Sequence, residues 1–403
     1  MRAPGDIGAL AALLDRAGWA ERPVAVLDLD AFDANAADLE RRAAGTPLRV
    51  ASKSLRVRGL LERVLARPGV AGLLAFTLPE ALWLVHHGAR DVVVAYPTAE
   101  RGAIRRLAAR PEALDAITLM VDGTAQLELL LDATADLAPR ADGRRLRVAL
   151  ELDVSYAPLP GVRFGALRSP VRTAVQAAAL ATEVLARPRL HLVGMMAYEG
   201  HIAGVTDSAR TPHGAAVRAM KRLSRPELAE RRAEAVAAVR ELAELEFVNG
   251  GGTGSIESTA AEAAVTEIAA GSGLIGPGLF DRYRDFAPQP ALHLGVSVVR
   301  RPAPGVATVL GGGWIASGVP GPDRLPTIAH PPGLSFAPQE AAGEVQTPVL
   351  GAAADALRVG DTVWLRHAKA GEPAEHFSSY VTVQGEEITG SLPTYRGEGA
   401  VFL

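Results

Sequence analysis

From residue 24 to about residue 270, short apolar runs alternate with amphipathic stretches in which leucine and alanine recur at spacings of three and four. The apolar runs predict strands at 24–30, 49–53, 72–77, 91–96, 116–122, 145–154, 190–200, 245–251 and 265–271. The stretches between them predict helices. Strands that alternate with helices form a parallel sheet, because each chain crossover passes through a helix. A longer helical stretch, 212–244, contains Pro226, which predicts a break into two helices.

The predicted strands number one more than a closed (β/α)8 TIM-like barrel needs. The first run, 24–30, precedes the others and is expected to pair elsewhere. After residue 285 the pattern changes to β-branched runs with Gly/Pro turns, which predicts a mainly β domain that the N-terminal strand completes. The expected organisation is therefore an N-terminal segment and strand (1–30), an α/β barrel (31–284) and a C-terminal β domain (285–403).

Composition narrows the function classes. The 403 residues are 48% apolar and 22% charged with a net charge of −3, so nothing resembles a basic nucleic-acid-binding surface. The chain has no cysteine, which excludes disulfides and thiolate metal sites. Neither a signal peptide nor an apolar run of membrane-spanning length is recognisable. We expect a soluble, cytoplasmic protein that acts on a small molecule and binds neither nucleic acid nor membrane.

Polar residues follow several of the predicted barrel strands, where the reactive groups of such barrels lie. They are Lys53, Asp153, Arg163, Tyr198, Glu199, His201, the loop NGGGTGS (249–255) and the segment AAGSG (269–273) with Ser272. Several polar groups that converge on one rim are a stronger signal than any of them alone.

Two of these features together indicate a cofactor. Lys53 follows a buried strand, and a lysine there is either a surface residue or one engaged in chemistry. The glycines of 249–255 let backbone N–H groups turn towards an anion, while Thr253 and Ser255 add hydroxyl donors. The loop matches neither a P-loop nor a dinucleotide fingerprint, and a turn without a ligand is the alternative. A lysine and a phosphate loop on one rim indicate pyridoxal 5'-phosphate, held as a Schiff base by a desolvated lysine of lowered pKa.

The chain resembles the fold-type III pyridoxal-phosphate enzymes, the alanine-racemase-like barrel group, in the D-threonine aldolase and D-serine dehydratase branch. The resemblance rests on AVLDLDAFDANAADL, SKS, GVRFG, AYEGH, FVNGGGTGS, TEIAAGSG and GDTVWLRHAKAGEPAEHFSSYVTVQGEEI, in this order along the chain. It implies that Lys53 binds the cofactor aldehyde, that Arg163 lies near the ring or its 3-oxygen, and that Tyr198 contacts the ring. It also implies that Gly251, Gly252, Thr253, Gly254 and Ser255, with Ser272 on the same rim, hold the phosphate.

The sequence departs from this branch in two places. The histidines that flank the cofactor lysine in H-x-K-T-H are replaced by Ala51 and Leu55. The metal pair H-x-C or H-x-D reads His367-Ala368-Lys369 here, so a cation stands where a ligand is expected. A divalent metal (Mn, Mg or Zn) at His367, with Glu372 or His376, is therefore disfavoured, because an ammonium group repels the ion.

His201 is the best candidate for a general base, since an imidazole titrates near neutrality. The preferred function is a lyase that cleaves a β-hydroxy D-amino acid to glycine and an aldehyde. A D-serine dehydratase-like activity and an amino-acid racemase, with Tyr380 or Tyr395 as a second base, are alternatives. A non-catalytic protein of pyridoxal phosphate homeostasis is another, disfavoured by the long region after the barrel. The resemblance further implies a homodimer.

Overall fold

The computed structural model describes residues 3–19, 21–138 and 140–403. They form two compact units: residues up to Asp38 with Ser54–Glu62 and Ser272–Val401, and Leu39–Lys53 with Arg63–Gly271 and Phe402–Leu403. After the last barrel strand the chain passes to the other unit at Ser272, before the predicted boundary at 284/285. Residues 1, 2 and 20 of the expected N-terminal segment 1–30 lie outside the described residues.

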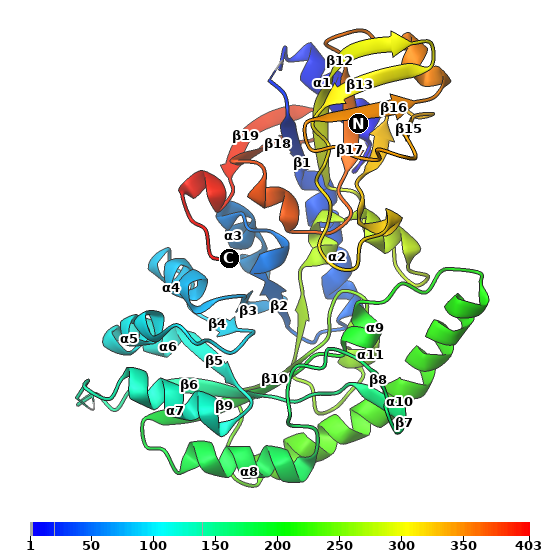
Figure 1. The fold of residues 1–403 in the computed structure, drawn as a ribbon. Coiled ribbons are helices and arrows are strands. Elements are labelled where there is room, and N and C mark those ends of the chain that lie inside the picture. The colour runs from blue at the N-terminus through cyan, green and yellow to red at the C-terminus, as the bar shows by residue number, and fades with distance from the viewer. Residues whose placement is uncertain (1–2, 20, 139) are drawn as a thin grey trace. The chain divides into compact units, whose positions relative to one another are not determined.

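The second unit is a closed barrel of parallel strands, as the alternating pattern predicts (Figure 1). Its strands are β2 (Leu48–Ala51), β3 (Val70–Ala75), β4 (Val92–Val94), β5 (Ile117–Val121), β6 (Leu146–Glu151), β9 (Leu190–Ala197), β10 (Phe247–Gly250) and β11 (Glu267–Ala270). β11 pairs with β2 and closes the barrel, with Ile268 opposite Leu48. Most strand residues are buried, because helices cover a parallel barrel outside and side chains fill it inside.

Helices lie between the barrel strands, as the amphipathic stretches predict, while the four-residue helix α9 was not predicted. They are α4 (Leu78–His86), α5 (Arg101–Ala109), α6 (Pro111–Ala116), α7 (Thr124–Ala133), α8 (Ala174–Leu185), α9 (Gly200–Ala203), α10 (Pro212–Arg240) and α11 (Ile256–Ala260), while α2 (Leu29–Arg42) and α3 (Arg58–Leu65) cross from one unit to the other along the chain. Local capping fixes several starts: Thr173 and Gln176 form a capping box at α8. A short hairpin, β7 (Tyr156–Leu159) and β8 (Val162–Phe164), follows β6.

The predicted break at Pro226 is wrong, because α10 runs unbroken from Pro212 to Arg240. A proline inside a helix removes one backbone hydrogen bond and leaves the carbonyl four residues earlier without its partner. Both Pro226 and Arg222 are exposed, so water can solvate that carbonyl. On the opposite side, Leu228, Val236 and other residues are buried and hold the helix together.

The first unit contains a mixed nine-stranded sheet. Its strands are β1 (Val24–Asp28), β12 (Leu292–Ala303), β13 (Val306–Leu310), β14 (Thr327–His330), β15 (Ser335–Phe336), β16 (Gln346–Leu350), β17 (Thr362–Arg366), β18 (Ser379–Gln384) and β19 (Glu387–Pro393). β1 lies between β12 and β18, so the prediction that the N-terminal strand pairs outside the barrel is confirmed. Helix α1 (Ile7–Arg16) packs Leu10 and Leu14 against Trp364 and Val26 of this sheet.

Short 3-10 segments connect the strands of both units. They are η1 (Ser52–Ser54), η2 (Ser272–Ile275), η3 (Gly278–Arg282), η4 (Pro322–Arg324), η5 (Ala352–Ala356), η6 (Glu372–Glu375) and η7 (Arg396–Glu398). Within the described ranges, no helix combines the length and the apolar character that a membrane span requires.

Candidate active site

Lys53 lies in η1, directly after β2 ends at Ala51, and its side chain is exposed. Its ammonium group donates a hydrogen bond of 2.8 Å to the hydroxyl of Tyr96, which follows β4. Burial raises the pKa of Tyr96, but the positive charge of Lys53 and its hydrogen bond outweigh burial, so the pKa is lowered. The two strand ends thus join an accessible amine to a phenol that loses its proton more easily than usual.

A second cation lies beside this pair. The guanidinium carbon of Arg168 is 5.3 Å from the ring centroid of Tyr96 and 5.8 Å from that of Tyr198, which follows β9. Both distances lie within the range of cation–π attraction. Arg168 is exposed, so its N–H groups can reach a solute on the rim. Neither Tyr96 nor Arg168 was predicted as a site residue, although Tyr96 ends the predicted strand 91–96 just as Lys53 ends 49–53.

Two carboxyl groups add to the charge of the rim. Glu151 is the last residue of β6, and burial, followed by the negative charge of Asp122, raises its pKa to about 7. Burial also raises the pKa of Asp122, which lies just after β5 and bonds to Gln126. Glu151 can therefore hold or release a proton near neutral pH.

Arg163 and His201, both predicted from the sequence, lie on the hairpin side of the rim. Arg163 donates to the carboxylate of Asp153 and, at 2.6 Å, to the hydroxyl of Ser155. His201 is only 3% exposed, and burial lowers its pKa, so the imidazole is neutral at pH 7. Among the described residues neither of its ring nitrogens has a hydrogen-bond partner. Its Nδ1 lies 3.5 Å from the position that a Cβ on Gly165 would take.

The glycine-rich loop follows β10 and lies against the ring of Tyr198. A Cβ on Gly252 would come within 3.3 Å of Cε2 of Tyr198 and within 2.8 Å of Cβ of Ala203. Gly251 has a φ of +87°, which favours glycine. Burial raises the pKa of Tyr198 to about 12, so this phenol stays protonated. The close approach to Ala203 and Tyr198 therefore favours glycine at position 252, and the positive φ favours it at position 251.

The hydroxyl groups of the loop are engaged with the protein. The Ser255 hydroxyl donates to the carboxylate of Glu199 at 2.8 Å and accepts from the backbone N–H of Gly252 at 3.1 Å. Arg42 donates to the carbonyl oxygen of Thr253 at 2.7 Å. Gly254 lies between Thr253 and Ser255 in the same loop. Glu199 was named from the sequence among the polar residues of the rim, but no pattern indicated its bonds to the loop.

A series of neighbouring groups leads from Lys53 to this loop: Lys53 bonds to Tyr96, Arg168 lies over the rings of Tyr96 and Tyr198, and Tyr198 lies beside Gly252. The residues present fit pyridoxal 5'-phosphate. They provide an accessible amine for the aldehyde, aromatic and cationic groups for the ring, and a backbone cradle that a side chain would fill. Ser272 begins η2 in the other unit, directly after Gly271 in the chain.

The surroundings of His367 do not fit a divalent metal. His367 is buried, its Nδ1 is 2.6 Å from the carbonyl oxygen of Lys369, and burial lowers its pKa to about 4. The Lys369 ammonium donates to the carbonyl oxygen of Ser317, while Glu372 accepts from the N–H of Ser317 and His376 is exposed. The described part of the chain contains no group of three histidine or carboxylate side chains arranged to hold a metal.

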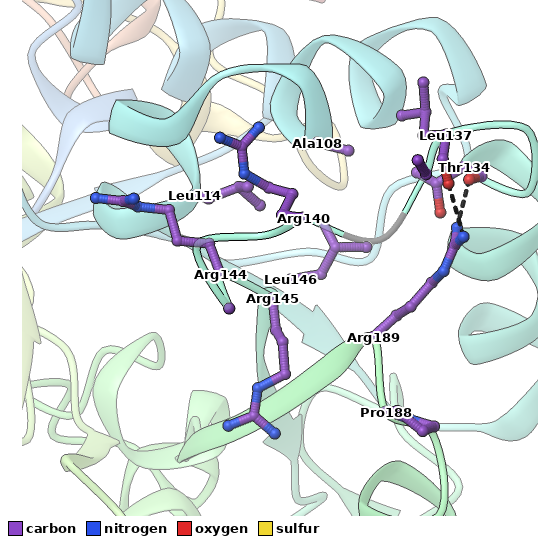
Figure 2. A pocket seen from close by; sticks show the side chains of 12 residues that line it. Ala108, Leu114, Thr134, Leu137, Arg140, Arg144, Arg145, Leu146, Pro188 and Arg189 are labelled. Carbon is purple, nitrogen blue, oxygen red and sulfur yellow. Dashed lines mark hydrogen bonds between the residues drawn. The ribbon is translucent and has the colours of Figure 1, made fainter.

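A cavity of about 200 Å³ lies elsewhere in the barrel unit, and Figure 2 shows the side chains that line it. It lies where β6 and β9 begin, at the end of the barrel opposite Lys53. Four arginines line it (Arg140, Arg144, Arg145 and Arg189), and their guanidinium groups point in different directions (Figure 2). Arg189, for example, donates to the carbonyl oxygens of Thr134 and Leu137. The cavity therefore offers no convergent set of donors and is separate from the candidate active site.

Residues 27–277 match the sequence family described as the alanine racemase N-terminal domain. The chain is also similar to 3-hydroxy-D-aspartate aldolase from Paracoccus denitrificans, with 29% identity over 257 residues. That match covers 62% of this chain and 59% of the aldolase, so the chain spans about three fifths of the length of the curated relative.

Two solved structures resemble this fold over nearly the whole chain. D-threonine aldolase from Filomicrobium marinum superposes with a TM-score of 0.78 and 22% identity, covering 95% of this chain and 96% of the other. D-threo-3-hydroxyaspartate dehydratase from Delftia sp. HT23 superposes with a TM-score of 0.70 and 20% identity, covering 93% and 97%. At these identities the likeness concerns the fold.

Proposed function

The chain belongs to the alanine racemase N-terminal domain family, and on this basis we propose that it is a pyridoxal 5'-phosphate-dependent lyase of a β-hydroxy D-amino acid. The name of the related 3-hydroxy-D-aspartate aldolase supports this substrate class. The observation that carries the proposal is the series of neighbouring groups that leads from Lys53 through Tyr96, Arg168 and Tyr198 to the glycine-rich loop.

The distribution of lysine supports Lys53 as the cofactor-binding residue. The chain contains only three lysines, at positions 53, 221 and 369. Lys221 is 4% exposed and pairs with Asp207 at 2.9 Å, and Lys369 is half-buried and donates to Ser317. Lys53 is the exposed one. Its amine is thus the most accessible of the three to an aldehyde.

The proposed reaction breaks the Cα–Cβ bond of the substrate. The β-hydroxyl loses its proton as the aldehyde forms, and Cα takes up a proton to give glycine. Pyridoxal phosphate, when bound, withdraws electrons from the bonds at Cα. The chain's own groups bind the substrate and move the protons.

Tyr96 is the preferred group for proton transfer. Its lowered pKa, partial exposure and contact with Lys53 support this role. His201, the base proposed from the sequence, is neutral but nearly fully buried, which makes it harder for a substrate to reach. Arg168, exposed and held over two tyrosine rings, provides a partner for a substrate carboxylate.

The residues around His367 do not fit a metal, so no step is assigned to one. The resemblance also supports a cytoplasmic homodimer. Light scattering should then give about twice the 42.0 kDa of one chain, and a stable monomer would contradict the dimer.

The test uses the purified protein with added pyridoxal phosphate. We expect visible absorbance that borohydride abolishes, and mass spectrometry that places the reduced adduct on Lys53. Incubation with D-threonine and with D-threo-3-hydroxyaspartate should release glycine. A 2-oxo acid and ammonia would instead indicate a dehydratase, and the L-amino acid a racemase. An adduct on Lys221 or Lys369, or a loaded protein without any product, would contradict the proposal.

A further inference from the structure

A buried carboxylate lies directly beside the glycine-rich loop. Glu199 is 1% exposed and accepts hydrogen bonds from four donors: the guanidinium of Arg232 at 2.7 Å, the backbone N–H of Gly251 at 3.2 Å, the hydroxyl of Ser255 at 2.8 Å, and the hydroxyl of Thr259. These donors come from α10, from the loop itself and from α11. The side chain of Glu199 therefore connects both ends of the loop to the two helices α10 and α11.

Arg232 holds this carboxylate in its ionised form. It is fully buried, donates to the carbonyl oxygen of Ala197 at 3.0 Å, and bonds to Glu262 as well as to Glu199. Burial raises the pKa of Glu199, but the charge of Arg232 and the hydroxyl donors outweigh burial, so the pKa is lowered. An ionised carboxylate only accepts hydrogen bonds, so it orients all of its donors towards itself.

The loop is built on this anchor. Because the Ser255 hydroxyl donates to Glu199, its oxygen is turned to accept the N–H of Gly252 at 3.1 Å. Gly251 is fixed at the same time by its own bond to Glu199. The backbone conformation of the loop therefore depends on the charge of Glu199, which is buried behind it.

We propose that Glu199, held by Arg232, is a positioning residue that shapes the glycine-rich loop into the binding site for the cofactor's phosphate group. This inference rests on the proposed function, because that function supplies the phosphate. It assigns the hydroxyls of Ser255 and Thr259 to the support of the loop. Glutamine at position 199 has one accepting oxygen and an NH2 group that donates, so it cannot satisfy all of these donors.

The experiment compares two aldehydes that differ only in the phosphate. Pyridoxal phosphate and pyridoxal are titrated into wild-type protein and into Glu199→Gln, with absorbance as the readout and thermal melting of the cofactor-free protein in parallel. Glu246→Gln is the matched control, because Glu246 pairs with Arg147 just before β10 and its side chain is 50% exposed. We expect the variant to bind pyridoxal phosphate at least tenfold more weakly, the lower end of the losses of about 10–100-fold that follow when residues supporting metal ligands are replaced. Its affinity for pyridoxal should stay within about twofold of wild type.

The outcomes separate this inference from the proposed function. If wild type binds neither aldehyde at Lys53, the proposed function fails. If wild type binds both and Glu199→Gln loses affinity for both equally, or for neither, the positioning role of Glu199 is wrong. Should Glu199→Gln fail to fold, Thr259→Val and Ser255→Ala carry the same test, since each removes one buried hydroxyl donor. Each must weaken pyridoxal phosphate alone, and an equal loss for pyridoxal would overturn the inference.

Discussion

Replacing Tyr96 by phenylalanine removes one hydroxyl group and keeps the ring that Lys53 and Arg168 contact. The lost hydrogen bond to Lys53 is 2.8 Å long and involves a charged donor, and such bonds contribute about 1.5–3 kcal/mol. Lys53 is exposed, so water replaces part of that energy and about 1 kcal/mol remains, roughly a fivefold effect. A group that transfers a proton in the reaction contributes far more, about 10²–10⁴-fold in rate.

We therefore expect Tyr96→Phe to lower kcat for glycine release at least a hundredfold, while cofactor loading and the melting temperature stay at wild-type values. Tyr283→Phe is the control, because its ring lies in an aromatic cluster with Phe280 and Phe286. The pH profile adds a second readout. Since the pKa of Tyr96 is lowered, the phenolate forms at a lower pH than for ordinary tyrosine, and wild-type kcat/KM should rise through that pKa. A loss of only about fivefold, with an unchanged pH profile, would refute a proton-transfer role.

Three further predictions concern stability and metal. Glu151→Gln should stabilise the protein by about 1–3 kcal/mol at pH 8 and by little at pH 4. The pKa of Glu151 in the folded protein, about 7, lies above its value in the unfolded chain, so ionisation of Glu151 destabilises the fold as the pH rises between the two values. Urea unfolding at both pH values measures this effect, and equal effects at pH 4 and pH 8 would contradict it. Arg49→Met should lower the free energy of unfolding by about 3–5 kcal/mol, because it leaves the buried carboxylate of Glu267 without its 2.6 Å ion pair. If urea unfolding shows that the free energy falls by less than about 1 kcal/mol, this explanation is wrong. A chelator should leave the lyase rate unchanged, because His367 bonds to the carbonyl oxygen of Lys369 and the side chain of Lys369 places an ammonium group where the related enzymes have a metal ligand. A loss of activity that zinc or manganese restores would show this prediction wrong.

The barrel, the separate pairing of the first strand and the candidate lysine could all be predicted from the sequence. Each depends on a local pattern: apolar runs for the strands, glycines for the loop, and a lysine at a strand end. The rim follows from the same pattern, since parallel barrel strands all end on one side. Pro226 shows the limit of local patterns, because the burial of one face of α10 preserves a helix that the local pattern would break.

Only the tertiary structure shows which groups the site residues contact. Lys53 and Tyr96 are 43 positions apart in the chain, and their contact depends on the order and register of neighbouring strands. Arg163 and Arg168 are both arginines after the same strand, but hairpin contacts turn one towards Asp153 and leave the other over two tyrosine rings.

Glu199 is the clearest case. In the sequence it is one acidic residue next to a tyrosine, whereas in the fold it supports the glycine-rich loop. Its ionisation depends on Arg232, which lies 33 positions away, and on hydroxyls from a different helix. The charge and the hydrogen bonds of a buried group depend on which side chains surround it in space. A sequence pattern specifies which residues face inward, but only packing of the whole barrel determines which of them meet.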